Sequence, residues 1–203
     1  MKPFIILVLT ILTMFLSGCK QNDIPEPVEE TPAVWIECEI NGMPFKMEAG
    51  ENAVYATAIA NDFDVNKREY IFKMDALALK KSFQISIYNY QHKLGDMYED
   101  LDSTIKPGEG RFLYTSMWPN FKPLPSRMFV IYEDLEKSLK YFTIPIYQGS
   151  SSYFEIVSVK DVVNEGKKFK MAEIRFSFEL ECPDNHWKLW VTKGHGFIPF
   201  GQK

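Results

Sequence analysis

Hydrophobic and polar residues alternate with a period of two along most of residues 34–203. This spacing predicts β-strands, because successive side chains of a strand point to opposite faces of a sheet. Residues 35–40 show it clearly, with apolar side chains on one face and glutamates on the other. The dipeptide Asn41-Gly42 follows, and it favours the two-residue turn of a β-hairpin. We therefore predict a hairpin in which residues 43–48 return antiparallel to residues 35–40.

Further strands are predicted where β-branched and aromatic residues lie between clusters of Gly, Pro, Asn and Asp. These segments are Ala53–Ala60, Glu69–Leu77, Ser82–Tyr90, Arg111–Thr115, Arg127–Glu133, Leu139–Tyr147, Tyr153–Lys160, Phe169–Cys182 and Trp187–Lys193. No segment holds an amphipathic helical pattern for three turns. We therefore predict an all-β domain over residues 34–203, built as a single antiparallel β-sandwich. The alternative is a closed or partly open β-barrel.

One predicted strand, residues 169–182, has an irregular pattern. Phe169 and Met171 stand at odd positions, whereas the apolar residues from Ile174 onward stand at even positions. One extra residue near Ala172-Glu173 would bring both sets to the same face, which is the effect of a β-bulge. The alternative is that two separate strands meet there.

The beginning of the chain has a different pattern. Lys2 is followed by an uncharged apolar run, Phe4–Leu16. As a helix this run would be about 20 Å long, shorter than the roughly 30 Å hydrocarbon core of a membrane. The residues Leu16-Ser17-Gly18-Cys19 resemble the lipobox of bacterial lipoprotein precursors, in which the cysteine is lipidated after cleavage. We predict a signal peptide over 1–18 and lipidation of Cys19; the alternative is an N-terminal anchor that is not removed.

Residues 19–33 are rich in proline and acidic residues and poor in large apolar ones. Proline stiffens the backbone and like charges repel, so we predict an extended tether between the lipid and the domain. The predicted location is the cell envelope, at the outer membrane, on its periplasmic face or at the cell surface. Acidic residues after the lipidated cysteine are similar to a surface-export signal of Bacteroidetes lipoproteins, and the alternative is a plain spacer.

The charges and the histidines exclude some kinds of partner. The chain has 23 basic and 27 acidic residues, a net charge of −4, and it lacks the basic stripe that nucleic acid binding requires. The histidines are His92, His186 and His195, which are not spaced as metal ligands on one element. We therefore predict a protein that binds neither nucleic acid nor metal.

The chain has three cysteines, and two of them remain once Cys19 carries the lipid. Cys38 and Cys182 both stand on predicted core faces of strands. One interpretation is a disulfide, which the compartment beyond the inner membrane permits. The other is a pair of buried free thiols that pack as small apolar side chains.

The sequence shows no nucleophile motif of the Gly-x-Ser-x-Gly type, and we predict neither enzymatic activity nor a cofactor. The segment 118–125 contains several prolines and carries Trp118 and Phe121. Rings on a rigid loop offer a stacking surface to a sugar or peptide, and the alternative is that they only cover the sheet. The acidic residues Asp96 and Glu99 supply the carboxylates that a glycoside hydrolase would need.

Four segments, 40–45, 154–161, 174–180 and 189–197, follow one another in an order that resembles a group of uncharacterised β-rich lipoproteins of the Bacteroidetes. These proteins run from an Asn-Gly hairpin to a closing strand with Thr-x-Gly and Phe, which corresponds to Thr192-Lys193-Gly194 and Phe197. The resemblance implies a β fold and an envelope location. Because the group has no established activity, the resemblance implies none for this chain.

Together these patterns predict a membrane-anchored lipoprotein whose domain is a non-catalytic binding or structural module. Its partner would be a glycan or another envelope protein. The first alternative is a surface glycan-binding protein that uses exposed aromatic residues. The second is a glycoside hydrolase that uses paired carboxylates.

Overall fold

The computed structural model describes residues 33–64, 67–89, 97–109, 113–114, 126–143, 152–164 and 167–201. These residues belong to the compact unit Thr31–Lys203. The predicted signal peptide, the lipidation site and the tether up to residue 32 lie outside the described residues. The segment 118–125 and Asp96 also lie outside them.

The described part of the chain forms one 12-stranded sheet and a short helix. The elements are β1 (Trp35–Ile40), β2 (Met43–Glu48), β3 (Val54–Asp64), β4 (Lys67–Ala76), β5 (Lys81–Asn89), α2 (Met97–Thr104), β6 (Gly108–Glu109), β7 (Leu113–Tyr114), β8 (Ser126–Asp134), β9 (Leu139–Thr143), β10 (Tyr153–Asn164), β11 (Lys167–Glu181) and β12 (Lys188–Gly201).

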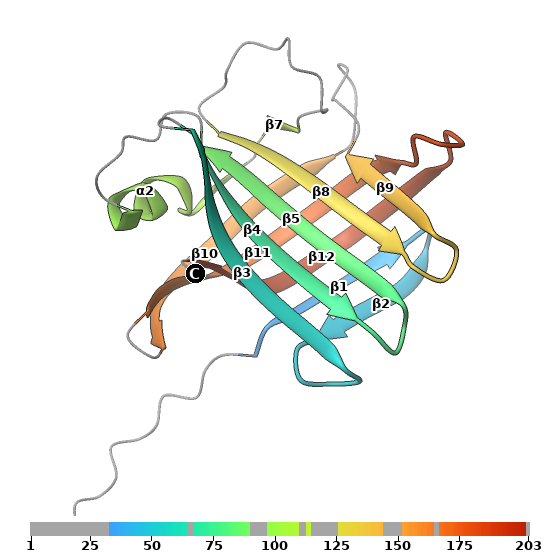
Figure 1. Cartoon of the computed structure of the whole chain (residues 1–203), viewed down its shortest axis with the longest axis horizontal. Coiled ribbons are helices and arrows are strands. Elements are labelled where there is room, and N and C mark those ends of the chain that lie inside the picture. Colours follow the sequence, from blue (N-terminus) through green and yellow to red (C-terminus); the bar gives the residue numbers. More distant parts are fainter. Residues whose placement is uncertain are drawn as a thin grey trace, which may run out of the picture. The chain divides into compact units, whose positions relative to one another are not determined.

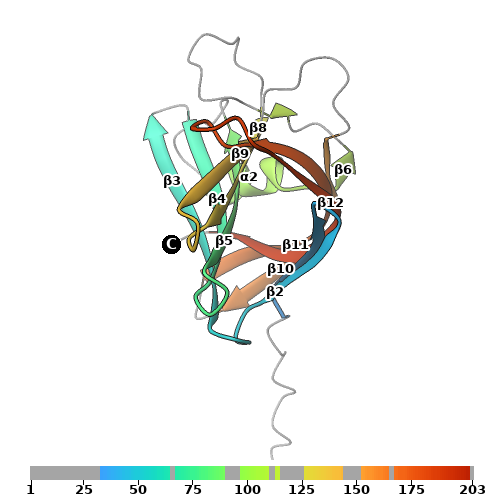
Figure 2. The ribbon, with the colours of Figure 1, turned by 90° about the vertical axis from the view of Figure 1, so that its right-hand side faces the viewer.

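The strands are hydrogen-bonded in the order β2-β1-β12-β11-β9-β8-β5-β4-β3. Strand β10 pairs with β11 and β6, and among the described strand pairs only β7 with β8 is parallel. The sheet curls until β3 and β4 approach β12, so that it is nearly closed into a barrel (Figures 1 and 2). The all-β prediction is confirmed, and of the two architectures the structure shows the barrel. A sandwich and a barrel have the same alternation of residues, so the pattern alone does not separate them.

The predicted hairpin is confirmed residue by residue. Ile40 pairs with Met43 across the turn. Asn41 and Gly42 have φ values of 51° and 80°, and a type I′ turn requires positive φ at both positions. The hairpin therefore places its apolar face, including the fully buried Ile36, toward the core.

Side chains from the whole sheet fill the interior of the barrel. The largest fully buried ones are Tyr70, Phe72, Phe83, Phe154, Phe176, Phe178, Phe200, Ile36, Met47, Met74, Ile85 and Ile87. The helix α2 adds Leu101 to the same core, and Asn89 of β5 donates a hydrogen bond to Thr104 at 3.0 Å. The barrel is therefore a packed core, with α2 bonded to the end of β5 (Figure 1).

Strand β12 contains a β-bulge that shifts its pairing register with both neighbouring strands, β11 and β1. Opposite β11, Phe176 pairs with Gly194 but Phe178 pairs with Val191, so β12 has one extra residue. Strand β1 shows the same shift between Glu37 and Glu39. The residue at the bulge, Lys193, has a φ of 53°. Inward-facing side chains of β12 therefore change from odd to even positions at the bulge.

The irregularity predicted near Ala172-Glu173 is wrong in its position. Strand β11 is continuous, and its register with β12 is unbroken from Phe169 to Phe176. The extra residue opposite this segment belongs to β10, where the register shifts between Ile156 and Ser158. Met171 and Ala172 point to opposite faces, and both are buried, with 3% and 0% exposure. Burial on both faces produced the pattern that resembled a bulge.

The glycines of β12 lie opposite large side chains of β11. A Cβ atom on Gly194 would lie 2.2 Å from the Phe176 ring, far inside van der Waals contact. Only glycine therefore lets Phe176 cover the backbone of β12 at this point.

We expect Gly194→Ala to lower the free energy of unfolding by about 1–3 kcal/mol, because the new methyl group forces the buried Phe176 ring out of its position. Gly108→Ala is the matched control, since nothing lies within 4 Å of a Cβ there, and it should change stability by less than about 0.5 kcal/mol. Urea denaturation measures both. Equal unfolding midpoints for the two variants would contradict the close packing of Phe176 on Gly194.

Candidate functional site

The residues predicted to bind or catalyse are only partly within the structure. Cys19, Trp118, Phe121 and Asp96 lie outside the described residues, and Glu99 lies in α2. The structure therefore leaves these predictions untested. The polar clusters that it describes lie at other places on the sheet.

Cys38 and Cys182 are both buried free thiols, which is the second of the two interpretations drawn from the sequence. Burial, together with the nearby charge of Glu37, raises the pKa of the Cys38 thiol to about 12. The thiolate is the nucleophilic form of cysteine, so this thiol is unreactive at neutral pH while the chain is folded.

The outer side of β11, β12 and β1 carries the polar side chains Glu37, Glu39, Glu173, Lys193 and His195 together with the aromatic Trp35, and we call this surface the β1–β12 face. His195 pairs directly with Glu37 across the two strands. Its Nε2 atom lies 3.1 Å from Glu173 Oε1, and its Nδ1 atom lies 3.9 Å from Glu37 Oε1. The imidazole therefore sits between two carboxylates.

The orientation of His195 is fixed from several directions. The Trp35 ring meets it edge to face, with 4.9 Å between centroids. Glu173 accepts a hydrogen bond from the Ser158 hydroxyl at 3.0 Å. The hydrogen bonds with His195 and then with Ser158 lower the pKa of Glu173 below its ordinary value. Glu173 is therefore a fixed negative charge next to a half-buried imidazole.

The order of these contacts differs from that of an activated serine. A catalytic serine needs its hydroxyl within hydrogen-bond reach of the imidazole that takes its proton. Here the Ser158 hydroxyl contacts one oxygen of Glu173, and His195 contacts the other. The carboxylate thus separates the hydroxyl from the imidazole, and the group does not form an activated serine.

An open groove of about 390 Å³ lies on the β1–β12 face and includes Glu37, the neighbour of His195. Its lining is Glu37, Cys38, Glu39, Pro44, Phe45, Lys46 and Lys193. The Lys193 ammonium lies 2.7 Å from Glu39 Oε1 across the strands. Groups of both signs therefore line the groove, and Pro44 adds an apolar contact on the outer side of β2, whereas the Phe45 ring packs inward against Tyr132. A polar ligand with charges of both signs would match this lining.

Sequence reasoning found only part of this face. The outward glutamates of the hairpin follow from the period-two pattern, but the position of Lys193 depends on the bulge in β12. One sequence signal indicates this bulge, namely a change in the positions of the apolar residues of β12. Leu189 and Val191 face inward at odd positions, whereas Ile198 and Phe200 do so at even ones.

A second cluster lies at the end of β11 nearest α2. Lys170 Nζ lies 2.7 Å from Asp102 Oδ1 and 2.8 Å from Asp161 Oδ1. Burial lowers the pKa of Lys170, but the hydrogen bonds to the two carboxylates outweigh it and the pKa is raised overall. An ammonium group thus sits between Asp102 and Asp161, whereas a glycoside hydrolase needs its two carboxyl groups to flank a sugar bond.

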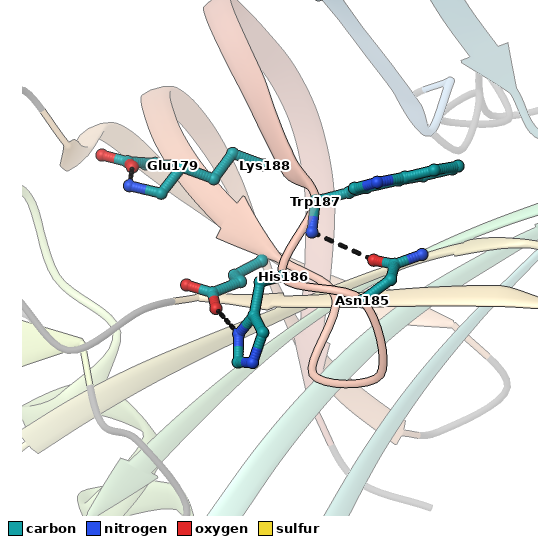
Figure 3. A network of polar contacts seen from close by, with 6 residues as sticks. Glu179, Asn185, His186, Trp187 and Lys188 are labelled. Atoms are coloured by element: carbon teal, nitrogen blue, oxygen red, sulfur yellow. Dashed lines mark hydrogen bonds and ion pairs between the residues drawn. The ribbon is translucent and has the colours of Figure 1, made fainter.

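The β11–β12 turn carries a third polar network (Figure 3). Lys188 Nζ lies 2.6 Å from Glu179 Oε1, and the Trp187 N–H donates to Asn185 Oδ1 at 3.0 Å. These contacts fix the turn while the Trp187 side chain points away from them and is 60% exposed. Trp190, the next tryptophan along the chain, is 49% exposed.

Among the described residues, no group of three or more His, Cys, Asp or Glu side chains is arranged to hold a metal ion. In the same part of the chain, no helix has the length and apolar character needed to cross a membrane. Comparison of the chain with protein-family models, curated proteins and solved structures finds no match.

We expect Glu173→Gln to reduce the loss of stability in acid. Because folding lowers the pKa of Glu173 below its ordinary 4.5, its stabilising effect is complete above that value. The effect is lost as the pH falls through the lowered pKa of the folded state. Urea denaturation at neutral pH and stepwise into acid should therefore give a flatter curve for Glu173→Gln than for the natural chain. Glu136→Gln, in the exposed β8–β9 turn, is the control; an unchanged slope for Glu173→Gln would refute the role of its contacts.

Proposed function

We propose that the protein is a lipoprotein of the cell envelope, anchored through Cys19, and that its barrel is a non-catalytic binding module. The ligand lies on the β1–β12 face. Buried side chains fill the barrel interior, which favours a site on the outer surface. The observation that carries the proposal is the groove beside the oriented His195, with Glu39 and Lys193 as fixed charges of opposite sign.

The lining of the groove indicates the class of ligand. Paired charges on a β-sheet surface favour a partner with complementary charges over a purely apolar one. Pro44 adds an apolar contact to the groove. A peptide segment of another envelope protein has both properties, and we propose it as the ligand class.

A second candidate function is glycan binding, and exposed tryptophans favour it. Trp187 is held on a turn whose polar contacts are satisfied locally, so its ring is presented to solvent without a mobile backbone. Trp118 and Phe121, on their proline-rich segment, would provide further rings. Aromatic rings bind the apolar faces of sugars by stacking at little cost in conformational entropy.

The anchoring prediction is tested by fractionation of cells that express the full chain. We expect Cys19→Ala to move the protein from the membrane pellet to the soluble fraction, because the lipid attachment point is lost. Cys182→Ala keeps Cys19 and should stay in the membrane pellet. If Cys19→Ala pellets as the natural chain does, the chain is not anchored through this cysteine.

The binding proposal is tested with residues 20–203 against a panel of charged peptides and envelope polysaccharides. We expect a peptide to bind, and Glu37→Gln combined with Lys193→Gln to weaken it by at least about tenfold, since each charged hydrogen bond is worth about 1.5–3 kcal/mol. Trp187→Ala is the matched control on the neighbouring turn. Polysaccharide binding that is lost in Trp187→Ala or Trp118→Ala would instead establish the second candidate. A peptide that binds the double variant and the natural chain equally would place its site elsewhere.

A further inference from the structure

The first described residues of the chain are bonded to one rim of the barrel. The Val34 carbonyl accepts a hydrogen bond from the Ala49 N–H at 2.8 Å, at the start of the β2–β3 turn. The same turn is closed by two hydrogen bonds, from the Gly50 N–H to the Val54 carbonyl at 3.0 Å and from the Val54 N–H to the Glu51 carbonyl at 2.8 Å. The segment that precedes the barrel is therefore joined to it next to the β2–β3 turn.

Hydrogen bonds connect the β2–β3 turn to the β4–β5 turn, and the β4–β5 turn to the β8–β9 turn. The Leu77 N–H of the β4–β5 turn donates to the Ala53 carbonyl at 3.3 Å. The Leu135 N–H of the β8–β9 turn donates to the Lys80 carbonyl at 2.9 Å. We call these three connected turns the leucine rim. Figures 1 and 2 both show the β2–β3 and β4–β5 turns side by side, at the lower end of the molecule.

Large apolar side chains are exposed at the leucine rim. Leu77, Leu79 and Leu135 are 57%, 46% and 49% exposed. Local hydrogen bonds hold the backbone that carries them, including the one from the Lys80 N–H to the Leu77 carbonyl at 3.2 Å. The three leucines thus expose apolar surface on turns that are hydrogen-bonded to one another, and exposed apolar surface of this kind marks interaction sites.

The turns of the leucine rim carry exposed charges of both signs: Lys80 and Lys137, and the acidic Glu51 and Glu136. Asp134 accepts from Lys81 at 2.5 Å, and its side chain is only 10% exposed. Lys137, on the other side of the same carboxylate, has a side chain that is 67% exposed. Lys80 lies next to Leu79 and is also exposed. Leucines with lysines beside them match a membrane interface, where apolar side chains enter the acyl boundary and ammonium groups reach the phosphates.

We propose that the leucine rim docks on a lipid bilayer, with Leu77, Leu79 and Leu135 inserted at its interface. The proposal rests on the anchoring part of the proposed function. A lipid on Cys19 would be joined to the barrel at this rim, through residues 20–33, which extended span at most about 50 Å. The tether then holds the rim near the bilayer, and the leucines set the orientation of the barrel.

The test uses residues 20–203, which contain the whole compact unit Thr31–Lys203. An N-terminal hexahistidine tag attaches them to vesicles of phosphatidylethanolamine and phosphatidylglycerol that contain a nickel-chelating lipid. Leu79→Cys carries an environment-sensitive fluorophore, and the buried thiols of Cys38 and Cys182 do not compete for the label. We expect a blue shift of the emission on tethering, and quenching by lipids labelled in the acyl chain.

Trp187→Cys, labelled in the same way, is the control. Its turn lies at the upper end of the molecule in Figures 1 and 2, and its side chain is 60% exposed, against 46% for Leu79. We expect no shift there. Leu77→Ser with Leu135→Ser should reduce the shift at position 79, whereas Tyr153→Ser with Val163→Ser, two exposed apolar residues outside the rim, should leave it unchanged.

An unshifted label at position 79, or equal shifts at positions 79 and 187, would overturn the proposal and leave a protein as the partner of the rim. The tag replaces the natural lipid, so the result does not depend on Cys19. Failure of the Cys19→Ala fractionation would refute the natural anchor, and failure of the fluorescence test would refute docking.

Discussion

The contact between the Phe176 ring and the backbone of Gly194 sets the geometry on which the barrel depends. Strand β12 lies between β11 and β1, so it joins the hairpin to the rest of the sheet. Close approach at Gly194 lets the ring fill the interior, and Phe176 stacks on Phe178 with 5.0 Å between centroids. At the neighbouring bulge at Lys193, the inward-facing side chains of β12 change from odd to even positions. Core packing and the outward charges of the β1–β12 face therefore have the same structural origin.

The all-β class, the first hairpin and the inward face of most strands follow from the period of two, because burial on one face selects apolar residues at alternate positions. The same pattern misplaced the irregularity of β11, where Met171 is buried on the face opposite to Ala172. It also ended the last strand at Lys193, whereas β12 continues to Gly201. That second half contains glycines and Pro199, which have low strand propensity. They are accommodated here because large residues of β11 lie opposite them.

The β1–β12 face was less accessible to sequence reasoning than the fold. Glu37, Glu173 and His195 are far apart along the chain, and only the register of three strands brings them together. Period-two patterns give the face on which a residue lies but not its cross-strand neighbour. In contrast, the lipobox-like segment is a local motif and could be read without any fold. Anchoring was therefore predicted from adjacent residues, and the groove was visible only in the structure.

The position of Pro44 has a consequence for neighbouring copies of the molecule. Strand β2 ends the hydrogen-bonded order of the sheet, and Pro44 pairs with Glu39 one step from the turn. In a two-residue hairpin the pair that flanks the turn exchanges both hydrogen bonds, so the nitrogen of the following residue faces the outer edge. Proline offers no donor there, and an extended chain approaching this edge loses one rung of its ladder. The hairpin at the end of the sheet is thus also protected at this position against strand-to-strand polymerisation.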